Sequence, residues 1–312
     1  MGKEKYFSGI NQNQSTNMIK KTCFLTLFVC YQVLGQQLNT VVNDDNGKPM
    51  LLGKTNKYAF TNKSFNWFHE NYDKYLTNTT VINQLKDSLQ QYNIQVFYGS
   101  WCGDSKRELP KFYKVLTQAG FPDKQLEMIA VDKKQDAYKQ SPGGEEKNLN
   151  IHRVPTFIFY KNNKEINRIV EFPKEDFERD ILKIVKGENY LPNYRIVEYL
   201  NKLMQQNSIE ELTKMKTNLT DGLSEFTFGS RELNTYGYVL LHSKQQEKAL
   251  FVFELNASMY PYKSNVYDSL GEAYYTVKNY KKALESFNHF LRLKPNDENA
   301  LNMIKTIQKE IN

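Results

Sequence analysis

Cysteine is scarce in this chain, which has Cys23, Cys30 and Cys102 among its 312 residues. Only four histidines are present, and no cluster of His, Cys or Asp has the spacing of metal ligands. No glycine-rich phosphate loop follows a predicted strand. We therefore predict neither a metal nor any other cofactor.

The chain also lacks a basic stripe and a long apolar run. Its net charge is +7, but the excess is modest and evenly spread, without interleaved aromatic residues, so a nucleic-acid partner is not expected. A membrane span needs about 20 apolar residues. The apolar run at 23–34 is shorter and is interrupted by Thr26, Tyr31 and Gln32, so no span is expected in the mature chain.

Residues 1–35 are typical of a secretory signal peptide. A basic pair precedes the apolar run, and Val33 and Gly35 suit the third and first positions before a signal-peptidase cut. Residues 1–17 are polar, so either the leader has a long first region or translation starts at Met18. This pattern predicts export to the periplasm or cell envelope.

Cleavage after residue 35 leaves Cys102 as the single cysteine of the mature chain. No internal disulfide is then possible, in a compartment where disulfides are normal. An alternative is that Cys30 is a lipoprotein cysteine, although Phe28 and Val29 are large residues for the positions before it.

The periodicity of apolar residues and the turn residues between apolar segments predict an α/β order in the first part of the chain. Ser64 is expected to cap the first helix, and Thr79 or Thr80 the second. Loop and short extended pieces are expected over 38–63, with a turn at 44–47. The expected strands are 94–98, 126–131, 156–160 and 166–170, and the expected helices are 64–76, 79–89, 102–120 and 177–185.

A period of 34 residues appears in the last third of the chain. It relates Gly237 to Gly271, Ala249 to Ala283, Phe253 to Phe287 and Pro261 to Pro295. This spacing predicts two tetratricopeptide repeats over 230–297, with a closing cap helix over 298–312. Glycine and alanine let paired helices approach closely, and the phenylalanine fills the space between them.

Residues 94–110 predict a strand that runs into Trp101-Cys102-Gly103 and then a helix. This order places Cys102 at the first turn of the helix. Free backbone N–H groups and the helix dipole favour a thiolate there.

The segment resembles the active-site segment of thioredoxins. Lys106 matches the basic residue that follows the usual second cysteine, and Pro110 falls eight residues after the thiol, where that family kinks its helix. Val154-Pro155 leads into a strand, as the family's cis-proline segment does. The resemblance covers 40–188 and implies a thioredoxin-like α/β fold; residues 189–229 would be bridging helices or a linker before the all-α tetratricopeptide domain.

One departure from the family decides the expected chemistry: Ser105 stands where the second cysteine would be. Cys102 can still attack a disulfide and form a mixed disulfide, but an external thiol must finish the exchange. Ser105, Lys106 and the helix amides would stabilise the thiolate, and Asp104 would oppose it or act as an acid–base group. Cys102, Ser105, Lys106 and Asp104 are therefore the candidate catalytic residues.

The resemblance also assigns the substrate side of the site. Trp101, Val154 and a cis Pro155 would hold an extended client strand. Val96 occupies the position of the family's buried acid, so the usual proton relay is missing. His152 and Arg153 would either face the thiol or lie in a solvated loop.

The repeats would bind a partner peptide on their concave face, with Asn234, Tyr238, Asp268 and Tyr275 as candidate groove residues. The alternative is that they only dock on the preceding domain. The leading hypothesis is a cell-envelope thiol–disulfide oxidoreductase with one reactive cysteine, a thiol or disulfide client and an external thiol reductant. The alternatives are a non-catalytic interaction scaffold and a redox-sensing thiol.

Overall fold

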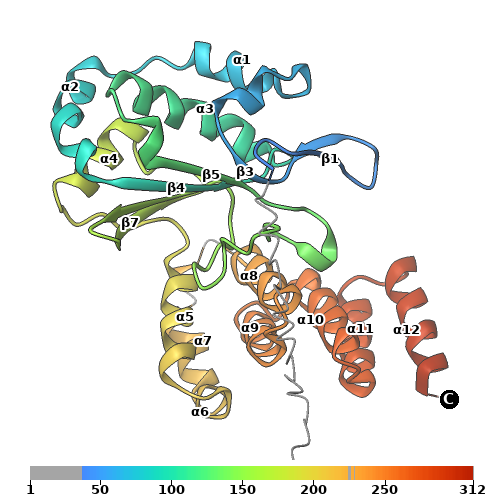
Figure 1. Cartoon of the computed structure of the whole chain (residues 1–312). Helices are drawn as coiled ribbons and strands as arrows, with labels where there is room; N and C mark the ends of the chain where they lie inside the picture. Colours follow the sequence, from blue (N-terminus) through green and yellow to red (C-terminus); the bar gives the residue numbers. More distant parts are fainter. Residues whose placement is uncertain (1–36, 224–225, 228, 312) are drawn as a thin grey trace, which may run out of the picture. The chain divides into compact units, whose positions relative to one another are not determined.

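The structure, a computed structural model, describes residues 37–223, 226–227 and 229–311. The predicted signal peptide, with Cys23 and Cys30, lies outside these residues. An α/β region comes first and a run of helices follows it (Figure 1). This order confirms the predicted fold class, a thioredoxin-like α/β domain followed by an all-α region of stacked helices.

The α/β region is organised on a five-stranded sheet with the order β3-β5-β4-β6-β7. Strand β4 runs parallel to β5 and antiparallel to β6. Strands β1 and β2 form a separate hairpin, closed by the turn predicted at 44–47. The strands are β1 (Val41–Asn43), β2 (Pro49–Leu51), β3 (Gly53–Thr55), β4 (Asn93–Tyr98), β5 (Leu126–Ala130), β6 (Thr156–Lys161) and β7 (Lys164–Val170).

The helices divide into a set that covers the sheet and a set that follows it. The first set is α1 (Trp67–Lys74), α2 (Thr79–Ser88), α3 (Gly103–Gln118) and α4 (Phe177–Val185). The second set is α5 (Arg195–Gln206), α6 (Ile209–Lys214), α7 (Lys216–Leu223), α8 (Arg231–His242), α9 (Gln246–Met259), α10 (Ser264–Thr276), α11 (Tyr280–Leu293) and α12 (Glu298–Ile311). No helix of the described residues is both long and apolar enough to cross a membrane.

Strand β4 is central, and its two faces enter different clusters of buried side chains. Ile94, Val96 and Tyr98 pack with apolar residues of α1–α4. Phe97 points to the other face and packs with Ile151 and other residues outside these helices. Alternate residues of a strand point to opposite faces, so this single strand anchors both layers.

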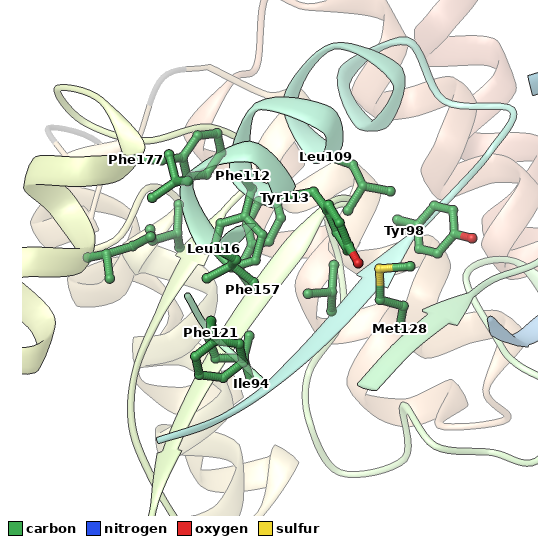
Figure 2. Close-up of a cluster of buried hydrophobic side chains, with 14 of the residues drawn as sticks. Ile94, Tyr98, Leu109, Phe112, Tyr113, Leu116, Phe121, Met128, Phe157 and Phe177 are labelled. Carbon is green, nitrogen blue, oxygen red and sulfur yellow. The ribbon is translucent and has the colours of Figure 1, made fainter. Parts of the chain in front are cut away.

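Helix α3 is fixed on the sheet by aromatic packing (Figure 2). The ring of Phe112 lies 4.2 Å from that of Phe157 on β6 and 5.4 Å from that of Phe177 on α4, measured between centroids. Pro110 lies inside the helix, as predicted, and is buried. The packing sets where α3 begins, which is where Cys102 lies.

The two predicted caps were wrong because asparagines take their place. Asn78 caps α2, where its Oδ1 accepts a hydrogen bond from the Val81 N–H at 3.2 Å, and Thr79 is already the first helical residue. Ser64 lies in a short 3₁₀ turn capped by Asn62, and α1 begins only at Trp67. Asparagine is among the best N-cap residues, so it caps ahead of the neighbouring hydroxyl residues.

The two predicted strands at 156–160 and 166–170 form an antiparallel hairpin, β6–β7, with a tight turn at Asn162 and Asn163. Their φ angles are 51° and 59°, in the left-handed region that asparagine tolerates. Two successive positive φ angles match the right-handed twist of the flanking strands.

The helices that follow the sheet are stacked in pairs, α8 with α9 and α10 with α11. Gly237 on α8 faces Phe253 on α9, and Gly271 on α10 faces Phe287 on α11. Both phenylalanines are fully buried. A Cβ at Gly237 would come within 2.7 Å of the Phe253 ring, and one at Gly271 within 2.9 Å of the Phe287 ring. The 34-residue spacing thus reflects two equivalent close contacts.

Replacing Gly271 by alanine should destabilise the protein by about 1–3 kcal/mol, because the new methyl group meets a buried ring that has no room to move. The measurement is chemical denaturation at equilibrium. Gly222→Ala is the matched control: Gly222 lies in α7, and a Cβ there would meet no neighbouring atom within 4 Å, so this variant should leave stability unchanged or raise it. Equal stability of the two variants would contradict the close-contact explanation.

Candidate functional site

Cys102 lies at the junction of β4 and α3. Its N–H donates a hydrogen bond to the Gly99 carbonyl at 2.8 Å, which closes a tight turn after the strand. Cys102 is the N-cap of α3 and offers no side-chain capping hydrogen bond. The first N–H groups of the helix therefore remain available to an anion beside it. The residue is half-buried.

The tryptophan before the cysteine is held from two sides. Its Nε1–H donates to the Val131 carbonyl at 2.8 Å, and its ring lies 6.3 Å from the ring of Tyr138. Gly99 lies directly against it, since a Cβ there would come within 2.7 Å of Trp101 Cε2. The close approach of Gly99 to Trp101 depends on the turn after β4, and no pattern in the sequence predicts it.

Val154 and Pro155 lie beside the sulfur. The Cys102 thiol donates a hydrogen bond to the Val154 carbonyl at 3.4 Å. The Val154–Pro155 bond is cis, as the resemblance implies. Antiparallel pairing of β4 with β6, with Phe97 opposite Thr156, brings these two segments together. The thiol and the predicted substrate strand site are therefore adjacent.

The other candidate catalytic residues surround the first turn of α3. Ser105 is fully buried, and its Oγ accepts a hydrogen bond from the Gly99 N–H at 3.1 Å. Ser105 thus contacts the turn before the cysteine, where it stabilises the backbone that positions the thiol. Lys106 is half-buried, and its carbonyl accepts a hydrogen bond from Asn71 on α1.

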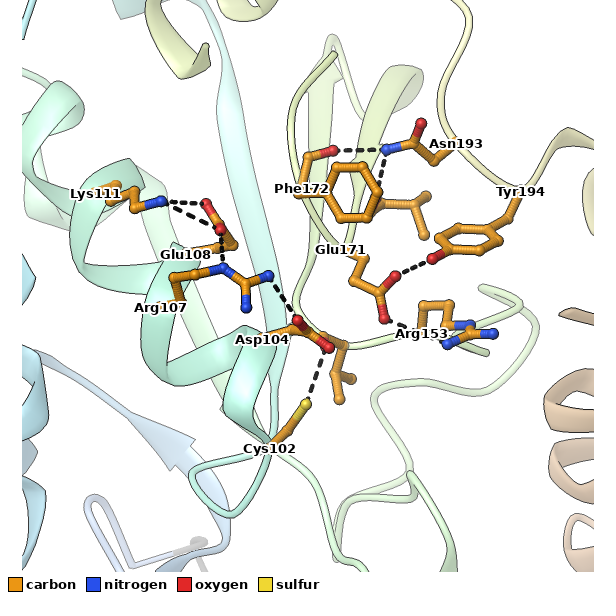
Figure 3. Close-up of polar contacts among 12 residues, drawn as sticks. Cys102, Asp104, Arg107, Glu108, Lys111, Arg153, Glu171, Phe172, Asn193 and Tyr194 are labelled. Carbon is orange, nitrogen blue, oxygen red and sulfur yellow. Dashed lines mark hydrogen bonds and ion pairs between the residues drawn. The ribbon is translucent and has the colours of Figure 1, made fainter. Parts of the chain in front are cut away.

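Asp104 forms an ion pair on the surface of α3. Its carboxylate pairs with Arg107 at 2.6 Å (Figure 3). Arg107 also contacts the buried Glu108, which pairs with Lys111 in turn. A carboxylate in the first turn also complements the helix dipole. The acid–base role of Asp104 stays a prediction.

Val96, which stands where the family has a buried acid, is itself buried in the structure. Its side chain is fully buried in β4, between Met128 on β5 and Phe157 on β6. An apolar residue there leaves that position without a proton donor or acceptor.

Both expectations for His152 were wrong: its ring neither faces the thiol nor is solvated. It is buried, with edge contacts to Tyr194 and Tyr236 at 5.9 and 6.0 Å between ring centroids. Burial lowers the pKa of His152 to about 3, with further repulsion from Lys139 and Arg153. The backbone that follows His152 therefore reaches the thiol at Val154, while the His152 ring packs against the helical region that follows the sheet.

Arg153 was expected near the thiol or in solvent, and it is a bridging residue instead. It pairs with Glu171 at 3.4 Å, and its guanidinium lies 4.6 Å from the centroid of the Tyr194 ring (Figure 3). It also donates to the carbonyl of Arg231 in α8 at 3.3 Å. The residue next to Val154 thus connects the site to the helical region.

The loop 132–141 contributes residues that the sequence did not indicate. The Asp132 N–H donates to the Gln140 carbonyl, and the Lys139 N–H donates to the Asp132 carbonyl. Lys139 is buried, and its ammonium donates to the carbonyl of His152 at 2.7 Å. It also lies 4.5 Å from the centre of the Tyr138 ring. A buried amine therefore contacts the backbone two residues before Val154.

The four candidate groove residues lie on α8 and α10. Tyr238 makes contacts inside the protein: its hydroxyl donates a hydrogen bond to the Glu272 carboxylate at 2.5 Å, and its ring stacks on the His242 ring. Asn234 has an Oδ1 that is buried. Burial and the neighbouring Glu272 raise the pKa of Asp268 to about 6. Tyr275 is half-buried beside Tyr280. Their role in binding remains a prediction.

No metal centre is formed by the part of the chain that the structure describes, because nowhere in it do three or more His, Cys, Asp or Glu side chains converge.

The sequence profile of the thioredoxin family matches residues 74–183, which include the thiol and the cis proline. Thioredoxin from Ophiophagus hannah is 31% identical over 87 residues, which are 28% of this chain and 73% of that protein. Thioredoxin H2 from Arabidopsis thaliana is 28% identical over 102 residues, 33% of this chain and 68% of that protein. Thioredoxin from Geodia cydonium is 28% identical over 99 residues, which are 32% of this chain and 84% of that protein.

The burial of neutral His152 predicts a dependence of stability on pH. Its pKa is about 6.5 when unfolded and about 3 in the fold, so between these values only the unfolded state binds the proton. The free energy of unfolding should fall with decreasing pH in this window, by up to about 1.4 kcal/mol per pH unit from this group.

The measurement is urea denaturation between pH 7 and pH 4, comparing wild type with His152→Gln. The variant should show a smaller fall, because glutamine does not titrate. His69→Gln, at an exposed histidine, is the control and should keep the wild-type slope. An unchanged slope in His152→Gln would contradict the assignment.

Proposed function

The chain belongs to the thioredoxin family, and on that premise we propose that it is a thiol–disulfide oxidoreductase that works with a single cysteine. The observation that carries the proposal is the position of the Cys102 sulfur. It belongs to a half-buried residue at the start of α3, and it is 3.4 Å from the Val154 carbonyl beside a cis proline.

The reaction starts with the Cys102 thiolate. It attacks one sulfur of a client disulfide, the client S–S bond breaks, and a mixed disulfide forms while the other client sulfur leaves as a thiolate and takes up a proton. The Val154 carbonyl, which accepts the hydrogen bond of the thiol, marks the proposed client side of the site. The helix amides stabilise negative charge on Cys102.

An external thiol completes the cycle because Ser105 cannot attack. The first external thiol displaces the client from Cys102 as its second free thiol. A second external thiol then attacks the new mixed disulfide and releases the Cys102 thiolate. In total, one client disulfide is reduced to two thiols, and two external thiols are oxidised to one disulfide.

We further propose that α8–α11 are two tetratricopeptide repeats that recruit a peptide of the client. The equivalent Gly–Phe contacts at a spacing of 34 residues support this assignment. The proposed location is the periplasm or cell envelope, which rests on the leader pattern of residues 1–35 and suits the chemistry, since disulfide clients are common there.

The number of sulfur exchanges tests the proposal directly. The probe is the aromatic disulfide 5,5′-dithiobis(2-nitrobenzoate), added to protein in which Cys23 and Cys30 are replaced by serine. Wild-type Cys102 should release one equivalent of the coloured thiol and keep the other half as a mixed disulfide. Ser105→Cys should release two, because it restores the second cysteine of the family's motif, which can attack and resolve the adduct.

Cys102→Ala should release none while it keeps its helical and sheet content by circular dichroism. No release by the wild type in native buffer, with full release after unfolding, would contradict the proposal. It would favour the alternative, a binding scaffold in which Cys102 has lost its redox role.

The recruiting role of the repeats is tested with Asp268→Asn and Tyr275→Ala. Both should reduce, several-fold, the amount of client trapped on Cys102 in envelope extracts, because they alter the proposed groove. Both should keep the stoichiometry with the aromatic disulfide. Asp87→Asn, at an exposed site on α2, is the charge-matched control. Unchanged trapping in both variants would contradict the role.

A further inference from the structure

The Cys102 thiol, as the structure has it, donates its hydrogen bond to a carbonyl. Such a contact stabilises the protonated thiol, because a thiolate has no proton to donate and is repelled by the carbonyl oxygen. Val96 supplies no charge at the position where the family carries an acid. A nearby cation would add to the helix amides in favouring a thiolate in this site.

Lys139 is placed to supply it. Its side chain is buried in the loop 132–141, with only 5% of the residue exposed. The ammonium is held by the His152 carbonyl at 2.7 Å, two residues before the Val154 carbonyl that contacts the sulfur. The Tyr138 ring lies 4.5 Å from the ammonium and 6.3 Å from the Trp101 ring.

The charges that act on Lys139 include Cys102. Burial is the largest effect and lowers the pKa of Lys139 to about 7; Arg153 also lowers it, while Cys102 and Glu171 raise it. Lys139 also acts on the imidazole of His152, and the Tyr138 ring lies against the amine; both groups are uncharged near neutral pH. The other titratable neighbours are thus one cation and one anion, already paired with each other.

We propose that Lys139 is a positioning residue for the thiol–disulfide exchange, a cation whose charge favours the negative form of Cys102 that attacks a disulfide. The inference rests on the proposed function. The buried amine binds its proton more tightly when the sulfur is negative, and the sulfur loses its proton more readily when the amine is positive. The two groups therefore titrate as a coupled pair.

The first test is the rate of alkylation of Cys102 by iodoacetamide between pH 5 and pH 9, in protein with Cys23 and Cys30 replaced by serine. Lys139→Met removes the charge and keeps the length of the side chain. At pH 7 it should react about tenfold more slowly than wild type, since charges across a buried site interact more strongly than charges in water. Its pH profile should lie at higher pH.

Two variants serve as controls. Lys134→Met removes an exposed lysine of the same loop and should leave the profile unchanged. Lys139→Arg keeps a positive charge and should restore most of the rate. A wild-type profile in Lys139→Met, or equal slowing by Lys134→Met, would overturn the proposal.

A second measurement does not require Lys139 to be replaced. The titration of Lys139 is followed by NMR of its Cε–Hε groups in wild type and in Cys102→Ser. Because coupling between two sites is reciprocal, the amine should lose its proton at lower pH when the sulfur is absent. Identical titrations would overturn the proposal.

The outcomes separate this inference from the proposed function. If Lys139 is not coupled to Cys102, the wild type can still release one equivalent from the aromatic disulfide. If the wild type releases none, the proposed function fails whatever the titration of Lys139 shows.

Discussion

The pairing of β4 with β6 is the constraint on which the site depends. With Phe97 opposite Thr156, the C-terminal end of β4 lies beside the N-terminal end of β6, so the segments that carry Cys102 and Val154 lie at the same end of these two strands. Both strands are buried, so a slip of one residue would turn apolar side chains out of the two clusters that they occupy. The register therefore fixes the separation of the sulfur from the Val154 carbonyl, and loop geometry only refines it.

Three successive residues, His152, Arg153 and Val154, link this site to its surroundings. The His152 carbonyl receives the buried ammonium, the Arg153 side chain joins Glu171 to the backbone of α8, and the Val154 carbonyl contacts the thiol. A change in the packing of the helical region against this segment would thus act on the backbone beside the thiol. The proposed client recruitment and the proposed chemistry share this short stretch of chain.

The sequence predicted the features that depend on periodicity and spacing. The strands that flank the site, the helix that starts after Cys102 and the Gly–Phe contacts of the helix pairs follow from local patterns. The cis bond before Pro155 follows instead from the family resemblance. The roles of His152, Arg153 and Lys139 depend instead on contacts between segments far apart in the sequence. A histidine, an arginine and a lysine in polar surroundings look solvated. Only the fold shows that His152 and Lys139 are buried and that Arg153 lies over the Tyr194 ring. The caps failed for a local reason, since three polar residues in a row each suit the start of α2.

The central claim is that Cys102 exchanges sulfur with other molecules. Its most direct test is mass spectrometry of the intact protein from cells quenched rapidly in acid, with the adducts on Cys102 identified after digestion. The account predicts that a measurable share of Cys102 carries a small thiol or a client peptide in a disulfide bond, and that this share disappears on reduction. Cys102 found only as the free thiol, including after the cells are exposed to a disulfide stress, would contradict it.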